Sequence, residues 1–355
     1  MKPITVRAEH EYQVIFTSAA PEALQPILEG ARQVAIIVPW DLRHLADEMK
    51  KRLEPLALEK LMIIEVPEGE SQKNVEILRM CWQRLGEANF RRNDSIIGLG
   101  GGATTDLAGF VAATWLRGIR WAAIPTSLAG MVDAAIGGKT GINTETGKNL
   151  VGSFYSPEVV IVDFEYLKTL PAAELRSGLA EVIKCGFIDD QKILEIIESA
   201  DDFMNVESHT LHELIERSIS VKAKVVSEDL RESFAREVLN YGHTMAHAIE
   251  RHQNYTWRHG DAVAVGLAYI ANLARETGVT TAQVCDRHMK ILQKVGLPTS
   301  YPRQAWSALF ENMQSDKKAR SNGIRFVAVT DEYKVIRLEG ISNDVLARAY
   351  ERISV

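Results

Sequence analysis

The sequence SIIGLGGGATTD, residues 95–106, decides the fold. Residues 95–99 predict a buried β-strand, which the glycines at 100–102 separate from a predicted helix that continues through Ala113. A buried strand that leads through a tight turn into a helix is the repeating unit of parallel α/β sheets. Glycines also let the backbone approach a ligand, and the free N–H groups at a helix start attract phosphate. The turn is not GxGxxG, however, and a tight strand–helix connection without a ligand would explain it on its own.

The same alternation continues on both sides of this turn. Predicted strands and helices follow one another through the first half of the chain: strands at 34–38, 61–66, 121–124 and 159–162, and helices at 41–53 and 74–88. Beyond about Pro171 the apolar spacing is helical, at 211–226 and 262–292, and a hairpin is predicted from 324–329 and 334–338. We therefore expect an α/β fold. It has an N-terminal Rossmann-like, mainly parallel sheet domain (1–170) and a C-terminal, mostly α-helical domain (171–355), with the active site in the cleft between them.

Composition narrows the class of protein. The 355 residues are 46% hydrophobic and 25% charged, which is typical of a globular chain, and the net charge of −6 argues against nucleic acid as a partner. The start of the chain lacks the layout of a signal peptide, and the longest apolar run, residues 262–274, is too short to span a bilayer. Cys81, Cys185 and Cys285 form no metal or redox motif and fit core residues in a reducing cytoplasm. We expect a cytoplasmic protein with no membrane partner.

Two further segments are predicted to share an edge of the sheet with the glycine turn. Thr126 and Ser127 follow the strand at 121–124, and residues 68–73 follow the strand at 61–66. Open sheets bind ligands at the carboxyl ends of their strands, so these segments favour a nucleotide site. A dinucleotide at this edge would place redox chemistry in the cleft between the domains.

Four of the nine histidines lie between residues 243 and 259, and three of them suggest a metal site. His243 and His247 lie one helical turn apart and share a helix face, and His259 follows closely. Three protein ligands with an open position are typical of a catalytic site for zinc. Glu181 is the best candidate for an oxygen ligand, because it lies in an otherwise apolar helical segment. A simple ion pair between Glu181 and Lys184 explains the same spacing.

Cations in apolar segments, or in the glycine-rich segments 137–141 and 147–149 that are expected to be loop-like, indicate the kind of substrate. Each has an ordinary alternative, because lysines usually lie on solvated faces, but their concentration in an acidic chain suggests a small substrate with several negative charges, such as a phosphorylated sugar acid. The residues concerned are Lys139, Lys148, Lys184, Lys222, Arg236, Lys317 and Lys318.

Taken together, these motifs resemble the 3-dehydroquinate synthase family, with an actinobacterial character. The blocks that carry the resemblance occur in the family's order, from about residue 66 to 318: GGG at 100–102 with Asp106, VDAAIGGKTGIN at 132–143, GKNLVG at 147–152, LAEVIK at 179–184, NYGHT at 240–244 and HG at 259–260. Several of the blocks are long, so chance similarity is excluded in practice.

The resemblance implies a role for each matching residue. Glu181, His243 and His259 match the metal ligands, zinc or cobalt being the metal, so the initial assignment of His247 to the metal changes to a substrate contact. The residues placed around the substrate's phosphate, carboxylate and hydroxyls are Asp133, Lys139, Asn149, Lys184, Lys222, Arg236, Asn240 and His247, together with one of Lys317 and Lys318. Arg117 matches an arginine that reaches the neighbouring subunit's site, which implies a homodimer.

The NAD-binding positions follow from the same resemblance. They are Glu68, Gly69, Glu70, Ser71, Gln72, Lys73, Gly102, Ala103, Thr104, Thr105, Asp106, Thr126, Ser127, Lys139, Tyr166 and Thr169, with Lys148 matching a position next to the cofactor or the substrate phosphate.

The implied reaction belongs to the shikimate pathway. It converts 3-deoxy-D-arabino-heptulosonate 7-phosphate to 3-dehydroquinate and phosphate by transient oxidation with NAD, β-elimination of phosphate, re-reduction and intramolecular aldol closure. NAD is regenerated in each turnover, so there is no net redox change.

Three other classes of protein remain open. Sugar-phosphate cyclases with valiolone-type or deoxy-inosose products share the fold, NAD and metal, but Arg236, Asn240 and His247 match the quinate-forming pattern. Metal-dependent polyol dehydrogenases share the glycine turn but have no need of this lysine set. A sensing module would bind its ligands without turnover, and the intact metal and cation set argues against it.

Overall fold

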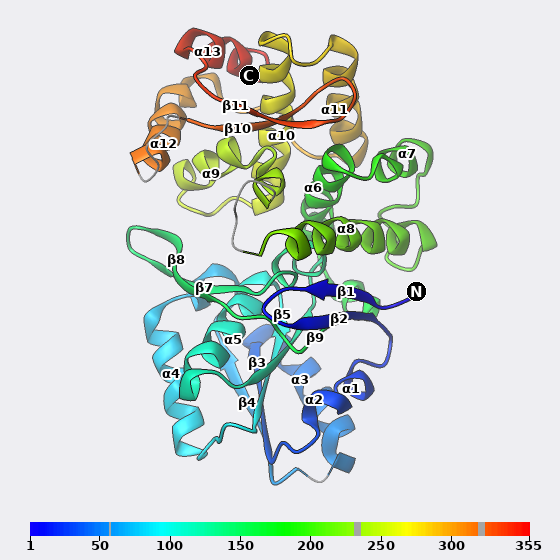
Figure 1. Ribbon diagram of the computed structural model, residues 1–355, viewed down its shortest axis with the longest axis vertical. Coiled ribbons are helices and arrows are strands. Elements are labelled where there is room, and N and C mark those ends of the chain that lie inside the picture. The colour runs from blue at the N-terminus through cyan, green and yellow to red at the C-terminus, as the bar shows by residue number, and fades with distance from the viewer. Residues whose placement is uncertain (57, 231–235, 319–323) are drawn as a thin grey trace. The chain divides into compact units, whose positions relative to one another are not determined.

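The computed structural model describes residues 1–355 except 57, 231–235 and 319–323 (Figure 1). The chain divides into two compact units. The first is Met1–Leu170 with Lys222–Arg231, and the second is Pro171–Val221 with Glu232–Val355. The expected division at residue 170 left Lys222 in the second domain, whereas the structure groups it with the first unit.

A seven-stranded sheet forms the centre of the first unit. Its strand order is β1-β2-β9-β6-β5-β3-β4, and every neighbouring pair is parallel except β1 with β2. The strands are β1 (Ile4–Arg7), β2 (Glu11–Phe16), β3 (Gln33–Pro39), β4 (Lys60–Val66), β5 (Ser95–Gly100), β6 (Arg120–Pro125) and β9 (Val159–Val162). The predicted parallel α/β architecture is confirmed, and so are all five predicted strands. Strands β1 and β2 were not predicted.

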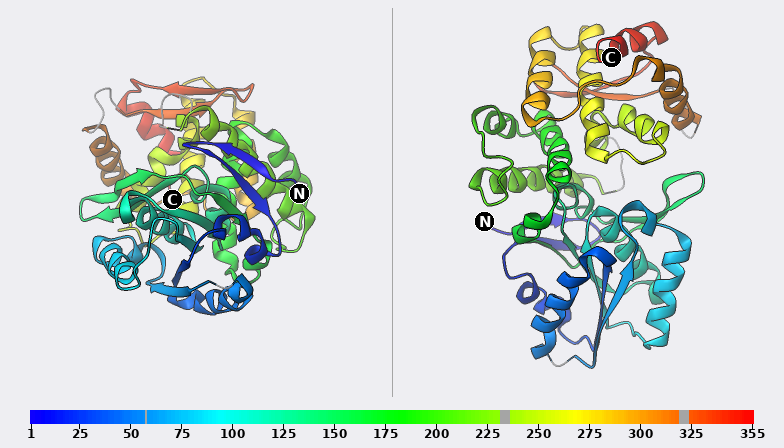
Figure 2. Two further views of the ribbon diagram at one scale, coloured as in Figure 1. Left: turned by 60° about the horizontal axis from the view of Figure 1, so that its bottom comes forward. Right: turned by 180° about the vertical axis from the view of Figure 1, so that it is seen from behind.

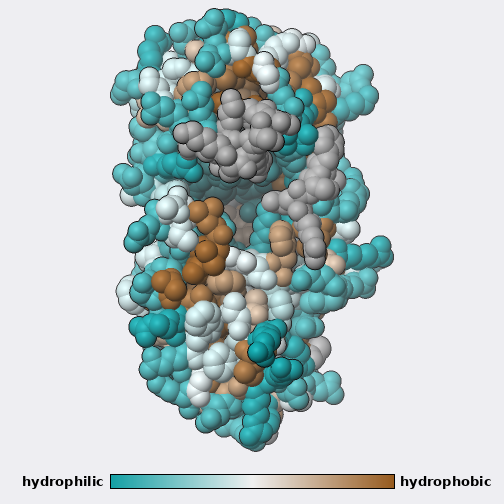
Figure 3. Space-filling model, turned by 60° about the vertical axis from the view of Figure 1, so that its left-hand side comes forward, coloured by the Kyte–Doolittle hydropathy of each residue, from teal (hydrophilic) through white to brown (hydrophobic). Residues whose placement is uncertain are grey.

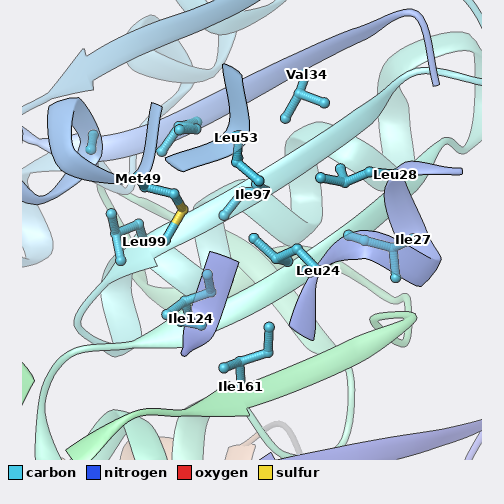
Figure 4. Packing of buried hydrophobic residues seen from close by; sticks show 14 of the residues in the cluster. Leu24, Ile27, Leu28, Val34, Met49, Leu53, Ile97, Leu99, Ile124 and Ile161 are labelled. Atoms are coloured by element: carbon cyan, nitrogen blue, oxygen red, sulfur yellow. The ribbon is translucent and has the colours of Figure 1, made fainter. Parts of the chain in front are cut away.

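Helices cover both faces of this sheet. Side chains of α1 (Ala20–Ala23), α2 (Gln25–Leu28) and α3 (Arg43–Leu53) pack against Ile97, Leu99 and neighbouring strand residues on one face (Figure 4). Successive side chains of a strand point to opposite faces, so Gly98 faces the other side. There an added Cβ at Gly98 would meet Ala108 Cβ of α5 (Gly102–Thr114) at 2.7 Å. The glycine therefore lets α5 lie directly on the sheet.

Shorter elements complete the first unit. They are α4 (Val75–Glu87) and the helical turns η1 (Trp40–Leu42), η2 (Glu54–Leu56), η3 (Gly69–Gln72), η4 (Trp115–Arg117), η5 (Gly130–Ala134) and η6 (Phe164–Thr169). The helices expected at 41–53 and 74–88 correspond to α3 with η1 and to α4.

One interpretation of the sequence was wrong. The glycine-rich segments 137–141 and 147–149 were expected to be loop-like, but from Lys139 onward they belong to the antiparallel hairpin of β7 (Lys139–Thr144) and β8 (Gly147–Phe154). The glycines serve close backbone approach instead. An added Cβ at Gly152 would lie 2.1 Å from the Thr140 carbonyl oxygen, and one at Gly141 would lie 2.7 Å from that of Val151.

The second unit is mostly helical, as predicted. Its helices are α6 (Ala172–Ile188), α7 (Gln191–Ser199), α8 (His209–Glu228, which continues into the first unit), α9 (His243–His252), α10 (His259–Glu276), α11 (Ala282–Val295), α12 (Trp306–Lys318) and α13 (Asn343–Glu351), with the turns η7 (Arg236–Asn240) and η8 (Arg303–Ala305). The predicted hairpin is confirmed as β10 (Phe326–Val329) and β11 (Val335–Leu338). Residues from Ala262 to Ala274 are buried without interruption, because α6, α9, α11 and α13 surround α10 (Figures 1 and 2).

Hydrophilic residues predominate on the face shown in Figure 3, where apolar residues form small patches. Within the described parts of the chain, no helix has the length and apolar character needed to cross a membrane.

Candidate functional site

The glycine turn lies at the point where the strand order of the sheet reverses. From β3 the chain first adds β4 on one side and then β5 on the other side. Open α/β sheets bind ligands outside the carboxyl ends of the strands at such a point. The carboxyl end of β5 is Gly100, so the turn at residues 100–102 occupies this position.

The turn excludes side chains. A Cβ added at Gly100 would meet Thr104 Oγ1 at 2.5 Å and Pro39 Cδ at 2.9 Å, and one at Gly102 would meet Ala134 Cβ at 2.8 Å. Gly101 is the N-cap of α5, and the backbone N–H groups of Thr104 and Thr105 both donate to its carbonyl oxygen. The first N–H groups of α5 have no partner within the helix and are available to an anion.

A buried lysine connects the turn region to the hairpin. The Lys73 side chain is 2% exposed, and its Nζ lies 2.5 Å from both Asp106 Oδ2 and Asn149 Oδ1. Burial alone would lower the pKa of Lys73, but Asp106 and Glu70 outweigh it and raise the pKa. Asn143 donates from its backbone to Lys73 O (2.8 Å) and from its side chain to Glu70 (2.7 Å). Residues 70–73, the start of α5 and the β7–β8 hairpin thus form one polar network.

Lys222 connects α8 to the turn η5 within the first unit. Its side chain, on α8, is 8% exposed and contacts Asp133 of η5 through both the backbone carbonyl and Oδ1. The structure therefore brings together two of the residues that the sequence placed near the substrate.

The second unit brings together Glu181, His243 and His259, from α6, α9 and α10. Their ligand atoms lie within 4.8 Å of one another. Glu181 Oε1 lies 3.4 Å from His243 Nε2 and 3.2 Å from His259 Nε2. A tetrahedral ion with bonds of about 2.1 Å separates its ligand atoms by about 3.4 Å, so the spacing fits a zinc-like ion.

Glycines at the helix crossings make this convergence possible. A Cβ added at Gly260 would lie 1.8 Å from the Ser177 carbonyl oxygen, where α10 begins against α6. One at Gly266 would lie 2.1 Å from the carbonyl oxygen of Gly242, where α9 begins against α10. Gly242 itself has φ 78°, a conformation that favours glycine, directly before His243. The two histidines are the first residues of their helices, and close packing sets both beside α6.

The electrostatics of the cluster favour an ionised carboxylate. Burial alone would raise the pKa of Glu181, but Lys184, whose ammonium is paired with Oε2, and the histidines hold it well below its usual range. Burial alone would lower the pKa of His259, yet its contacts with Glu181 and Glu250 raise it to about 10. Such a carboxylate is ready to hold a cation. The Glu181–Lys184 pair expected as an alternative is therefore present together with the cluster.

Glu250 was not predicted from the sequence. It lies on α9 and is 4% exposed, and its Oε1 is 3.4 Å from His259 Nδ1. Glu250 follows His243 by two helical turns, on the same face of α9. Its partner, His259, lies on α10, so no periodicity within α9 could have identified Glu250 from the sequence.

The other residues of the second unit that were predicted to contact the substrate differ in burial and in distance from the cluster. His247 is exposed and does not join the cluster among the described residues, although its ring centroid is 5.5 Å from that of His243. Arg236 and Asn240 bound η7 shortly before His243, and Arg236 is 2% exposed. Lys184 is buried beside Glu181. The side chains of Lys317 and Lys318 lie outside the described residues.

In the first unit, exposure of the predicted residues varies. The buried residues are Gln72, Thr104, Thr105 and Thr126. The exposed residues are Glu68, Gly69, Glu70, Ser71, Lys139, Asn149 and Thr169. Intermediate exposure is found for Gly102, Ala103, Asp106, Ser127, Asp133, Lys148 and Tyr166. Arg117 is exposed on η4 with φ 68°, next to Leu116 at φ 50°, so this turn is held in an unusual backbone conformation.

The fold is that of the sugar-phosphate cyclases. The valiolone synthase ValA of Streptomyces hygroscopicus, solved with NAD+ and Zn2+ bound, has a TM-score of 0.88 over 99% of this chain and 98% of its own, at 21% identity. At that identity the likeness establishes the fold alone.

Sequence comparison identifies the family. Residues 63–177 match the N-terminal model of 3-dehydroquinate synthase, and residues 178–319 match the C-terminal model. The 3-dehydroquinate synthase of Corynebacterium diphtheriae is 47% identical over 100% of this chain and 99% of its own, and that of Corynebacterium glutamicum is 51% identical over 92% and 90%. The chain belongs to the 3-dehydroquinate synthase family. The expected family and its actinobacterial character are both confirmed.

Proposed function

We propose that this chain converts 3-deoxy-D-arabino-heptulosonate 7-phosphate to 3-dehydroquinate and phosphate, with NAD and a divalent metal ion, zinc or cobalt. The observation that carries the proposal is the convergence of Glu181, His243 and His259, with ligand atoms within 4.8 Å of one another, in a chain 47–51% identical to curated synthases. Family membership makes the chain an enzyme of the shikimate pathway, which leads to the aromatic amino acids.

The metal would be held by Glu181, His243 and His259. One carboxylate and two neutral imidazoles are a donor set suited to zinc, and they leave a position for substrate oxygens. When bound, the ion supplies Lewis-acid polarisation of a substrate hydroxyl or carbonyl. Lys184 lies against Glu181. We assign Lys184 to the same substrate region, where its charge would stabilise developing negative charge on oxygen.

The cofactor would lie along the sheet edge. The glycine turn at 100–102 and the start of α5 would receive its phosphates, with residues 68–73, Thr126, Ser127 and the turn from Tyr166 to Thr169 around the rest. ValA, which has the same fold, has been solved with NAD+ bound. When bound, NAD supplies reversible hydride transfer without net redox change. The network around Lys73 would fix the shape of this edge.

Different side chains would bind the carboxylate and the phosphate of the substrate. We assign Arg236, Asn240 and His247 to its carboxylate, because a guanidinium binds a carboxylate through two parallel N–H groups. The cations Lys139, Lys148 and Lys222, with Asn149 and Asp133, would contact the phosphate and the hydroxyls. A lysine on the leaving phosphate stabilises the charge that builds up as the C–O bond breaks.

Arg117 would complete the site of a second subunit. It is exposed on a turn whose backbone is strained, and such strain persists where the surroundings impose a particular geometry. Because Arg117 matches an arginine that reaches the neighbouring subunit's site in the family, we propose a homodimer. We also propose that the enzyme acts in the cytoplasm.

A matched pair of substrates tests the proposal. Phosphate release is measured with the heptulosonate phosphate and with the corresponding seven-carbon ketose phosphate that lacks the carboxylate. We expect turnover of the first and a kcat/KM at least about 100-fold lower for the second, because the second substrate has no carboxylate to accept charge-assisted hydrogen bonds from the arginine. Equal kcat/KM values would contradict the carboxylate assignment and favour a cyclase of another product class. Accumulation of NADH would instead indicate a polyol dehydrogenase.

A further inference from the structure

The two histidines of the metal cluster have different neighbours on their outer sides. Both direct Nε2 toward Glu181. His243 Nδ1 lies 3.1 Å from the backbone carbonyl oxygen of Tyr241, a neutral acceptor. His259 Nδ1 lies 3.4 Å from Oε1 of Glu250, a carboxylate with a side chain only 5% exposed. One ligand is thus oriented by the backbone and the other by a buried acidic side chain.

An acidic neighbour acts on a histidine ligand in two ways. A carboxylate can only accept, so it favours the ring tautomer with the proton on Nδ1 and leaves the lone pair of Nε2 toward the ion. Its negative charge also makes Nε2 a stronger donor.

The charge balance of the cluster points the same way. A divalent ion with ionised Glu181 and paired Lys184 would leave an excess of about two positive charges in a buried site, which is costly. Glu250 would reduce this excess to about one.

We propose that Glu250 is a positioning residue of the metal centre, which holds His259 in the Nδ1–H tautomer and strengthens its Nε2 as a ligand. The inference rests on the proposed function only in requiring that the cluster binds a metal ion. It concerns affinity for the metal and involves no contact with substrate or cofactor.

Zinc affinity of the metal-free protein tests this role without NAD or substrate. Competition with a chromophoric chelator gives the zinc dissociation constant of the wild type, Glu250→Ala and Glu250→Gln. We expect Glu250→Ala to bind zinc about 10–100-fold more weakly, the usual effect of losing such a partner. Glu250→Gln should lie between, because the amide keeps an oxygen at the same place but not the charge.

Glu276→Gln is the matched control. Glu276 lies at the other end of α10 from His259, with a side chain 12% exposed, and pairs with Arg348 and Arg352. Its loss removes a carboxylate from the same unit without affecting the cluster, so the zinc dissociation constant should stay within about twofold of the wild type, well below the loss expected at Glu250.

A second measurement separates positioning from a general structural role. Nitrogen-15 histidine spectra of the zinc-bound protein should show the proton of His259 on Nδ1 in both proteins, because zinc occupies Nε2, but in Glu250→Ala the Nδ1–H proton should lose the downfield shift that its carboxylate acceptor gives it. If Glu250→Ala does not fold, the isosteric Glu250→Gln decides. Zinc affinity within about twofold of the wild type in the folded Glu250 variants, or an equal loss in Glu276→Gln, would overturn the inference.

The outcomes also separate this inference from the proposed function. A wild type that binds zinc in a Glu250-dependent way but releases no phosphate would contradict the function alone. An active wild type whose Glu250 variants keep full zinc affinity would contradict the inference alone. A wild type that binds no zinc would overturn both.

Discussion

The sheet edge of the first unit and the helical cluster of the second unit are built in opposite ways. At the edge, the glycines at 100–102 remove side chains so that backbone N–H groups can meet a ligand. In the cluster, Glu181, His243 and His259 supply the donor atoms themselves, and glycines serve only to bring their helices together. The edge should therefore be sensitive to added atoms, whereas the cluster should be sensitive to the identity of each side chain.

The largest effect is expected at the cluster. His259→Ala removes one of three ligands, so zinc binding and turnover should be lost, by at least about 100-fold in kcat, while the fold persists. Metal content by atomic emission, with circular dichroism as the fold control, checks this. Full metal content in the variant would contradict the ligand assignment.

A buried histidine on α11 gives the second effect. His288 is fully buried, its Nδ1 lies 2.8 Å from Val284 O and its Nε2 2.7 Å from the hydroxyl of Tyr241, and burial lowers the pKa of His288 to about 4. An unfolded histidine titrates near 6.5, so the unfolded chain takes up a proton that the folded chain refuses. The resulting stability is present above about pH 6.5 and is lost as the pH falls toward about 4, up to about 3 kcal/mol.

Urea unfolding of the metal-free protein at several pH values measures this loss. The free energy of unfolding of His288→Gln should depend less on pH over the same range, because the variant has no such group to titrate. An identical pH dependence in the variant and the wild type would show that His288 does not remain neutral in the folded protein.

The third-largest effect is expected on the binding of the substrate. Arg236→Ala should raise KM for the heptulosonate phosphate by about 10–100-fold, because a hydrogen bond to a charged group contributes about 1.5–3 kcal/mol. Arg236→Lys keeps the charge but loses the planar pair of donors, so it should restore KM only in part. Steady-state kinetics with both variants checks the order, and an unchanged KM in Arg236→Ala would count against the carboxylate role.

The smallest effect is expected at the edge, from one methyl group. In Gly100→Ala the new Cβ would lie 2.5 Å from Thr104 Oγ1, so we expect a loss of about 1–3 kcal/mol in the free energy of unfolding. Gly101→Ala is the matched control, since its nearest contact, Ser127 Oγ at 3.5 Å, is an ordinary one. Equal stability of the two variants would show that the turn relaxes easily.

The same contrast explains what was predictable from the sequence. The strand, turn and helix at residues 95–113 are local, so apolar runs and glycines predict them directly. The cluster joins residues 181 and 259 across three helices, and spacing alone favoured His247, which shares a helix face with His243. The apolar surroundings of Glu181 already indicated it as an oxygen ligand, but only the resemblance to a family removed His247 from the ligand set.

Other differences have physical causes of the same kind. The β7–β8 hairpin was missed because the glycine-rich segments 137–141 and 147–149 were interpreted as loops, whereas Gly141 allows close contact with the backbone of β8. Glu250 was missed because its partner, His259, lies on the next helix, beyond the reach of any periodicity.

The central claim is that the edge and the cluster serve one cyclase reaction without net redox change. The most direct test supplies the heptulosonate phosphate, NAD and zinc, and follows phosphate release together with the absorbance of NADH. We predict phosphate release without accumulation of NADH, abolished by a chelator and restored by zinc. Steady accumulation of NADH, or phosphate release that a chelator does not affect, would contradict the account.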